Sequence, residues 1–255
     1  MSNPAVSSLA AGPPAPQAGR PPGKWPKILP PLTPEQKHIN DDFMAYWHEV
    51  LPHKYALADR FCHHYVLKRP SPGFRRTLEV GAGLGEHLRY EKLTPEQERE
   101  YIALDSRQNM IDRLKTRFPK IRACLGDCQT TLDFPDNSFD RIIAINVLEH
   151  LPDLPRAVEE FYRLCDKRSG FLSTVIPCEG GLAYSLARRI SAQRIFTQRY
   201  NCPYQTFIGR EHINFPWEIY GELNRRFRIT TRSFFPIPIP LEFCNLFIGL
   251  TLRPK

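Results

Sequence analysis

The sequence predicts an α/β protein built on a mostly parallel sheet with helices on both faces. Short apolar segments expected to form strands alternate with helical patterns, and they lie at 77–81, 101–105, 121–125, 139–145 and 170–176. This alternation is typical of βαβ units. The first segment runs into Gly81, Gly83 and Gly85, and the second ends on Asp105. A glycine turn followed by such an acidic residue is typical of a nucleotide-type cofactor site at the carboxyl edge of a parallel sheet.

The remaining elements are predicted from the same kinds of pattern. Helices should start near Gly85, Asn109 and Leu154, and another should cover about 216–226. The last two strands, at 228–235 and 245–253, are separated by too few residues for a helical crossover. They should therefore pair antiparallel.

The chain is expected to divide into three parts. Residues 1–31 carry nine of the 25 prolines, so we expect a disordered Pro-rich arm. Thr33 followed by Pro34 is a helix-start signal, and residues 32–70 should form an N-terminal helical cap. Residues 71–255 should form the α/β domain. The alternation of strands and helices lapses at about 179–216, which predicts a substrate-side insertion there.

The composition favours a soluble, cytoplasmic protein without a metal site. Prolines interrupt the N-terminal segment, and no clean run of eighteen apolar residues occurs. The seven cysteines are scattered and odd in number, as is typical of reduced thiols. Cys62-His63-His64 and the pair Cys124 and Cys128 lack partners at zinc-site spacing, so no metal is expected. The net charge of +8 favours anionic partners but does not by itself indicate nucleic acid.

The glycine spacing indicates which cofactor the turn would accept. A dinucleotide site needs G-x-G-x-x-G, and the position of the third glycine holds Glu86 here. A carboxylate would repel a pyrophosphate, although Asp105 alone would suit the ribose of NAD equally well. A cofactor with a cationic centre and no phosphate tolerates Glu86, and S-adenosylmethionine is such a cofactor.

Five segments in order resemble class I S-adenosylmethionine-dependent methyltransferases, and more narrowly the small-molecule branch typified by ubiquinone and menaquinone biosynthesis enzymes. They lie at 79–85 (EVGAGLG), 103–106 (ALDS), 126–128 (GDC), 134–140 (FPDNSFD) and 146–151 (NVLEHL). The resemblance covers about 75–255. It implies a Rossmann-like, seven-stranded sheet of order 3-2-1-4-5-7-6 whose last strand is antiparallel, and an enzyme of the methyltransferase class.

The resemblance also implies a set of residues that bind S-adenosylmethionine. Glu79 would help to order the methionine amino group and the glycine loop, and Asp105 would accept hydrogen bonds from the ribose. Asp127 would meet the adenine amino group beside Cys128, and Asn146 would lie next to the sulfonium. The complete set is Glu79, Gly81, Ala82, Gly83, Gly85, Asp105, Ser106, Asp127, Cys128 and Asn146.

Two histidines are candidates for a catalytic base, which an oxygen acceptor would need more than a neutral amine. His150 follows the fourth strand, and His212 lies in the insertion beside Arg210 and Glu211. The insertion combines arginines with aromatic residues, which favours an acceptor with an anionic group and an apolar portion. A small phenolic acid, a phosphate-linked glycan and a lipid-linked intermediate would each fit. The apolar segment 234–240 could make a peripheral membrane contact, or could form the hairpin between the last two strands.

Two other functions fit the sequence less well. Methyltransferases acting on exocyclic base amines carry an Asn/Asp-Pro-Pro-aromatic motif after the fourth strand, whereas this chain has Asn146-Val-Leu-Glu149 there. That difference argues against a nucleic-acid (RNA) acceptor. A non-catalytic adenosylmethionine-binding interaction protein is the third reading, and the intact cofactor motif counts against it.

Overall fold

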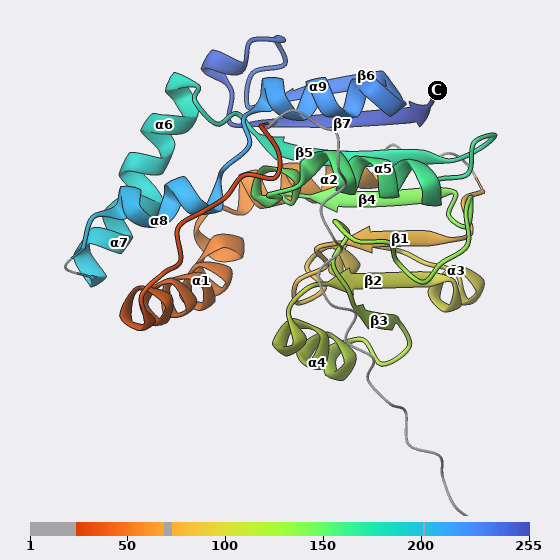
Figure 1. Cartoon of the computed structure of the whole chain (residues 1–255), viewed down its shortest axis with the longest axis horizontal. Coiled ribbons are helices and arrows are strands. Elements are labelled where there is room, and N and C mark those ends of the chain that lie inside the picture. Colours follow the sequence, from red (N-terminus) through yellow and green to blue (C-terminus); the bar gives the residue numbers. More distant parts are fainter. Residues whose placement is uncertain (1–23, 69–72, 201) are drawn as a thin grey trace, which may run out of the picture.

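The computed structural model describes residues 24–68, 73–200 and 202–255 (Figure 1). The α-helices are α1 (Pro34–Lys54), α2 (Ala56–Leu67), α3 (Pro95–Arg99), α4 (Gln108–Arg117), α5 (Leu154–Leu164), α6 (Leu182–Arg188), α7 (Arg194–Arg199), α8 (Tyr204–Glu211) and α9 (Pro216–Arg226). The strands are β1 (Thr77–Val80), β2 (Tyr101–Asp105), β3 (Arg122–Leu125), β4 (Arg141–Ile145), β5 (Phe171–Pro177), β6 (Phe227–Phe235) and β7 (Phe247–Pro254). Single 3-10 turns are η1 (His87–Arg89), η2 (Leu148–His150) and η4 (Glu242–Cys244), whereas η3 (Arg189–Gln193) is a short π-helix.

The seven strands form one sheet in the order β3-β2-β1-β4-β5-β7-β6. The first five strands are parallel, and β7 runs antiparallel to both β5 and β6. This arrangement confirms the predicted fold class, the strand order and the antiparallel final pair. The carboxyl ends of all five parallel strands consequently meet at one edge, which lies on the left of the sheet in Figure 1.

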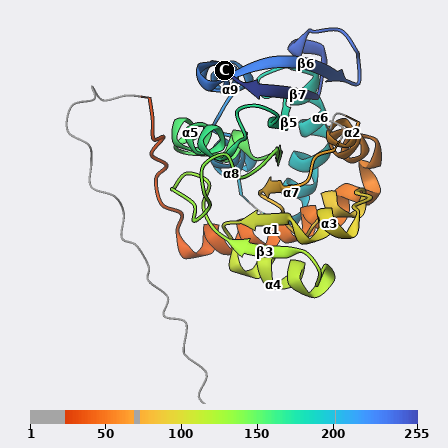
Figure 2. The same ribbon diagram turned by 90° about the vertical axis from the view of Figure 1, so that its right-hand side faces the viewer.

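Helices cover both faces of the sheet. On one face, α5 and α9 bury Phe161, Leu164 and Leu223 against Ile142 and Leu172. On the other face, α2 packs through a second cluster that includes Val66, Ile143 and Val175. Figure 2 shows α5 and α2 on opposite sides of the strands. β1, β2 and β4 are buried almost throughout, and their residues are apolar or aromatic except for Thr77, Glu79, Asp105 and Arg141.

The helix expected to start near Gly85 is shorter than predicted. Gly81, Gly83 and Gly85 all adopt positive φ, and the chain after them forms only the η1 turn. The buried His87 side chain turns to Glu91, with 2.8 Å between Nε2 and Oε1. The left-handed glycines therefore carry the loop further than the sequence pattern indicated, and regular helix resumes only at Pro95, behind a capping box on Thr94.

The end of the predicted N-terminal arm that the structure describes lies against the domain. The main-chain N–H of Lys27 donates to the carbonyl of Pro152 at 2.9 Å, and the ammonium group of Lys27 lies 2.9 Å from Glu218. The ring of Trp25 packs at the edge of the main core. The disordered arm stays a prediction for residues 1–23, which lie outside the described residues.

The predicted insertion is helical and forms a small core of its own. Helices α6, η3 and α7 run continuously, and α8 follows after a short connection. Phe196, Tyr204 and Phe207 are buried against Phe43 of α1. These aromatic side chains therefore anchor the insertion rather than line an open pocket. The same four helices lie beyond the carboxyl edge of the sheet in Figure 1.

Candidate active site

The candidate site is built from the segments that follow β1 to β5 at the carboxyl edge of the sheet. In open α/β sheets this edge is where ligands bind. The sequence-predicted cofactor residues are divided among the ends of β1, β2, β3 and β4, and the strand order brings those ends side by side. Glu179, which follows β5, adds a group that the sequence analysis did not single out.

The glycine loop after β1 is held close to its neighbours on both sides. The N–H of Ala82 donates to the carbonyl of Leu104, and the N–H of Gly83 donates to Oδ2 of Asp105, each at 3.0 Å. A Cβ on Gly81 would lie 2.5 Å from Cγ2 of Val147, in the loop after β4. With φ of +67°, Gly81 is also in a conformation that side chains disfavour. Glycine is therefore required here by both backbone and space.

Asp105 is buried at the end of β2 and already accepts several hydrogen bonds. Besides Gly83, the N–H of Arg107 donates to Oδ1 at 3.0 Å, and Nε of Arg107 lies 3.1 Å from the same oxygen. Nη2 of Arg107 also donates to Oδ2 at 3.4 Å. These four contacts use the roughly four lone-pair positions of the carboxylate, so a ribose hydroxyl would take the place of the Arg107 guanidinium. The Arg107 contact was not predicted, and it pairs a half-exposed cation with the carboxylate expected to bind the ribose. Ser106, between them, is exposed.

Glu79 lies deeper than the other predicted residues. It is buried in β1, and the hydroxyl of Tyr101 donates to its Oε2 at 2.8 Å. Burial raises the pKa of Glu79 to about 8, against the lowering effect of the Tyr101 hydrogen bond. The carboxyl group is therefore mainly protonated at pH 7. Its role in ordering the cofactor amino group stays a prediction.

The loop after β3 carries Asp127 and Cys128 and is tied firmly to α5. Oδ1 of Asp127 accepts the N–H of Gln129 at 2.9 Å, and Oε1 of Gln129 accepts the N–H of Asp153 at 2.7 Å. Cys128 is buried in the main core. Asp127 thus caps a local turn whose position depends on the start of α5.

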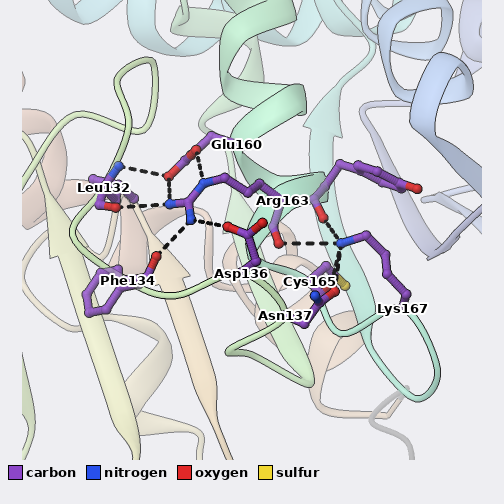
Figure 3. Close-up of polar contacts among 9 residues, drawn as sticks. Leu132, Phe134, Asp136, Asn137, Glu160, Arg163, Cys165 and Lys167 are labelled. Carbon is purple, nitrogen blue, oxygen red and sulfur yellow. Dashed lines mark hydrogen bonds and ion pairs between the residues drawn. The ribbon is translucent and has the colours of Figure 1, made fainter.

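Arg163 of α5 holds the next part of that loop, as Figure 3 shows. Its guanidinium donates to the carbonyls of Leu132 and Phe134 at 2.9 and 2.8 Å and to Glu160 at 2.7 Å. Glu160 in turn accepts the N–H of Leu132 at 2.8 Å. This planar network explains why the loop expected to frame the adenine is ordered without regular secondary structure.

Asn146 follows β4 in a conformation that is rare outside glycine. Its φ is +51°, and its Oδ1 is buried without a hydrogen-bond partner among the residues that the structure describes. Its Nδ2 lies 3.9 Å from Sγ of Cys62 on α2. Both observations are typical of a residue held in a strained conformation for a ligand.

His212 pairs with an acidic residue from another part of the chain. Nδ1 of His212 lies 2.9 Å from Oε2 of Glu179. Arg188 of α6 contacts Oε1 of the same carboxylate at 2.5 Å. Burial alone would raise the pKa of Glu179, but the neighbouring His212 and Arg188 outweigh it and hold that pKa below its ordinary value. The pair thus joins an ionised carboxylate to a histidine that presents its other ring nitrogen, Nε2.

His150 and Glu149 lie beside this pair. The rings of His150 and His212 meet edge to face, with 5.0 Å between their centroids. Nδ1 of His150 is 2.5 Å from the carbonyl oxygen of Glu211. Glu149 is fully buried, and burial raises its pKa to about 7, although the neighbouring His212 opposes this. Donor atoms of Glu149, His150 and His212 lie within 4.8 Å of one another, so these three residues could hold a metal ion.

Asn214 fixes His212 in place and was missed as a functional residue. Its buried side-chain amide donates to the carbonyls of Leu148 and Leu151 at 2.7 and 2.8 Å. The N–H groups of Ile213 and Asn214 both donate to the carbonyl of Glu149. The segment after α8 is thereby clamped onto η2. The sequence signal for this was the proximity of Asn214 to His212, whereas nothing local pointed to Glu179.

Comparisons with known proteins identify the domain. A protein-family model described as a methyltransferase domain matches residues 78–173. Residues 78–173 are thus similar to a methyltransferase domain. This match, with the sheet described above, supports the predicted class I family and S-adenosylmethionine as the cofactor.

The relatives of this methyltransferase domain differ in their reactions. Malonyl-[acyl-carrier protein] O-methyltransferase of Halorhodospira halophila is 31% identical over 118 residues, which are 46% of this chain and 39% of that protein. The chain thus spans well under half the length of this relative. An S-adenosylmethionine-dependent methyltransferase of Thermotoga maritima has a TM-score of 0.57 at 18% identity, covering 86% of this chain and 99% of its own. The [4+2]-cyclase SpnF has a TM-score of 0.55 at 15% identity over 77% of this chain and 80% of its own, so the fold alone does not fix the reaction.

The residues at the methyltransferase domain's carboxyl edge fit this cofactor. Gly81, Gly83 and Gly85 carry no side chain that could block the approach of a ligand to the loop, and Asp105 can exchange its contacts with the half-exposed Arg107 guanidinium for ribose hydroxyls. Oδ1 of Asn146 is buried without a hydrogen-bond partner among the residues that the structure describes. S-adenosylmethionine offers hydroxyl, amine and sulfonium groups of matching polarity. The described part of the chain contains no helix with the length and hydropathy needed to cross a bilayer.

Proposed function

We propose that this protein is an S-adenosylmethionine-dependent methyltransferase that methylates an oxygen of a small or carrier-linked acceptor. The observation that carries the proposal is the contact between His212 and Glu179 at the carboxyl edge of the sheet. It supplies an oriented base on the side of the site opposite the ribose position. A neutral amine acceptor would need no such base, whereas a hydroxyl acceptor gives up a proton on transfer.

The cofactor residues do three things in this proposal. The glycine loop lets the methionine portion approach the backbone, Asp105 accepts hydrogen bonds from the ribose, and the loop after β3 frames the adenine. Asn146 would fix the end nearest the methyl group. When bound, S-adenosylmethionine supplies a methyl group on a cationic sulfur, which an aligned nucleophile displaces in line. The protein then contributes mainly orientation and exclusion of water.

The proton would leave the acceptor through His212. Its Nδ1–H donates to Glu179, so the ring is held in the tautomer whose Nε2 can accept a proton. The ionised carboxylate stabilises the imidazolium that forms. His150, anchored to the carbonyl of Glu211, packs edge-on against the His212 ring and holds its plane. We therefore assign the base to His212 and a positioning role to His150.

Two observations bear on the class of acceptor. The curated relative is named as an O-methyltransferase of a carrier-bound malonyl group, which supports an oxygen acceptor. A carboxylate acceptor of that kind would need no base, whereas a phenol, a glycan hydroxyl or a lipid-linked hydroxyl would. The His212–Glu179 pair favours the hydroxyl acceptors.

A labelled-methyl transfer screen tests the proposal. Purified protein with methyl-labelled S-adenosylmethionine should be offered phenolic, glycan, lipid-linked and carrier-linked carboxylic acceptors, with RNA as a separate arm. We expect transfer to a hydroxyl acceptor that His212→Ala abolishes. Transfer to RNA alone would favour a nucleic-acid methyltransferase. Transfer to a carboxylate at a rate that His212→Ala does not change would show that His212 is not a catalytic base.

A further inference from the structure

The continuous helix formed by α6, η3 and α7 presents an exposed stripe of apolar side chains. Leu182, Leu186 and Ile190 recur at intervals of four residues and are 60%, 57% and 66% exposed. Arg189 and Arg194 flank this stripe and are also exposed. A shallow depression of about 420 Å³ runs along the same face between Leu186 and Thr197. Large apolar side chains rarely gather on a free surface without a binding role.

A second exposed apolar segment lies beside the first. The loop between β6 and β7 carries Ile239, Leu241 and Phe243, which are 51%, 55% and 64% exposed. The loop reaches α6 directly, because a Cβ on Gly181 would lie 2.8 Å from the carbonyl oxygen of Glu242. Both views in Figures 1 and 2 place this loop next to the start of α6. We call Leu182, Leu186, Ile190, Ile239, Leu241 and Phe243 together the apolar rim.

The charge around the apolar rim is one-sided. No Asp or Glu occurs between Glu179 and Glu211, whereas that stretch contains Arg188, Arg189, Arg194, Arg199 and Arg210. Arg188 pairs with the buried Glu179, and Arg199 pairs with the partly exposed Asp42. Arg189 and Arg194, which are also exposed, provide the positive charge next to the apolar side chains. The acidic residue of the neighbouring loop, Glu242, is only half-exposed. Apolar side chains bordered by arginines are complementary to an anionic bilayer surface.

The inner face of the same helix reaches the candidate base. The ring of Tyr184 stacks on His212 with 6.1 Å between centroids, and Arg188 binds Glu179. A helix is about 10 Å across, so the apolar rim and the His212–Glu179 pair are separated by roughly one helix diameter. A protein lying on a bilayer through the rim would hold this base close to the head-group layer.

We propose that the apolar rim, with Arg189 and Arg194, docks this protein on the surface of an anionic lipid bilayer. The rim side chains enter the outer part of the bilayer, and the two guanidinium groups pair with lipid phosphates. This inference rests on the proposed function only where it names the acceptor. Docking in this orientation makes the acceptor a lipid-linked hydroxyl whose head group reaches His212 from the membrane.

Vesicle co-sedimentation of the full chain tests the docking surface. Vesicles of phosphatidylcholine with about one quarter phosphatidylglycerol should bind the wild type at low salt and release it at high salt, since exposed charges are screened. Leu186→Asp and Ile190→Asp should each lower the partition coefficient between bilayer and water about tenfold or more, because each removes one aliphatic side chain that the bilayer would bury. Arg189→Gln and Arg194→Gln should each lower it about fivefold.

Matched controls keep the test specific. Leu125→Asp changes an exposed apolar residue on β3, at the other end of the sheet, and Arg113→Gln removes an exposed arginine from α4. Both should bind vesicles like the wild type. Equal binding by the rim variants and the controls would overturn the proposal, as would failure of the wild type to sediment. A dimer that Ile190→Asp dissociates, with no vesicle binding, would assign the rim to self-association instead.

Vesicle docking and the proposed methyltransferase function can be tested independently of each other. Adenosylmethionine binding, measured by calorimetry without vesicles, should be unchanged in the rim variants. Vesicle binding without adenosylmethionine binding would support the docking surface and contradict the proposed methyltransferase function. Methyl transfer to a water-soluble acceptor that vesicles do not accelerate would remove the lipid-linked acceptor.

Discussion

Nδ1 of His212 lies 2.9 Å from Oε2 of Glu179, although 33 positions separate the two residues along the chain. One residue follows β5 and the other follows α8, so only the fold brings them together. Asn214 and the carbonyl of Glu149 clamp the His212 segment onto η2, and Arg188 holds Glu179 from the opposite side. The candidate base is therefore positioned by four separate elements.

The pair predicts a specific pH dependence of turnover. His212→Ala should lower kcat about 100-fold or more, which is the usual contribution of a general base. Glu179→Gln should lower kcat less, and should move the acidic limb of the pH–rate profile to lower pH because the imidazolium loses its negative neighbour. Steady-state kinetics across pH 5 to 9 checks both. Arg225→Gln, on the exposed end of α9, serves as control, and an unchanged limb in Glu179→Gln would separate that carboxylate from the base.

The glycine loop predicts a coupling between β1 and the loop after β4. Gly81→Ala should destabilise the protein by about 1–2 kcal/mol for the positive φ, plus a contribution from the 2.5 Å approach to Val147. Gly73→Ala is the matched control, since its φ is +84° but no atom lies within 4 Å of the added Cβ. Urea unfolding of both variants, and of Gly81→Ala combined with Val147→Ala, gives the interaction energy. Equal losses in the two single variants would show that no clash exists.

The buried Glu149 predicts how stability depends on pH. Its pKa is about 7 in the folded protein and 4.5 ordinarily, so the folded state binds more protons between these values. Stability should therefore fall as pH rises through that window, by up to about 3 kcal/mol from this group. Glu149→Gln removes this dependence, so the stability of the variant relative to the wild type should increase between pH 5 and pH 8. Denaturant titrations of the wild type and of Glu149→Gln at both pH values check this prediction. If the free energies of unfolding of the two proteins change equally with pH, Glu149 ionises normally.

The cluster of Glu149, His150 and His212 predicts a response to chelation. If His212 acts as a base, turnover should survive treatment with EDTA, since proton transfer needs only the ring and Glu179. Activity should be measured after dialysis against EDTA and again with added Mn²⁺ or Zn²⁺, ions that such donors bind well. Loss of activity that either ion restores would make these three residues metal ligands and would overturn the base assignment.

Features that depend on neighbouring residues could be predicted from the sequence, whereas features that depend on tertiary contacts could not. The strand order was implied by the resemblance to a known family, whereas the strands and the cofactor edge were predictable because apolar runs, glycines and the acidic end of β2 are local signals in the chain. The short η1 turn was not, since it depends on three left-handed glycines and on the burial of His87. Arg107 over Asp105 and Glu179 beside His212 were missed for a related reason. Their roles are set by side-chain contacts, and the second contact joins residues distant in the sequence.

The aromatic residues of the insertion illustrate the same limit. Phe196 and Tyr204 occur among arginines, which favoured a binding pocket, yet both are buried against Phe43 of α1. Composition identified a distinctive segment, but only packing shows which side chains face inward. The exposed members of that segment are the aliphatic ones, Leu186 and Ile190.

Calorimetric titration of S-adenosylmethionine into the wild type and into Asp105→Asn tests the central claim most directly. Asp112→Asn, the same change at an exposed position on α4, is the matched control. The wild type and the control should bind one cofactor per chain with equal affinity. Asp105→Asn should weaken binding about tenfold to a hundredfold, as expected for losing a charged hydrogen-bond acceptor. Absence of saturable heat in the wild type, with no rise in Tm, would contradict the assignment of this edge as an adenosylmethionine site.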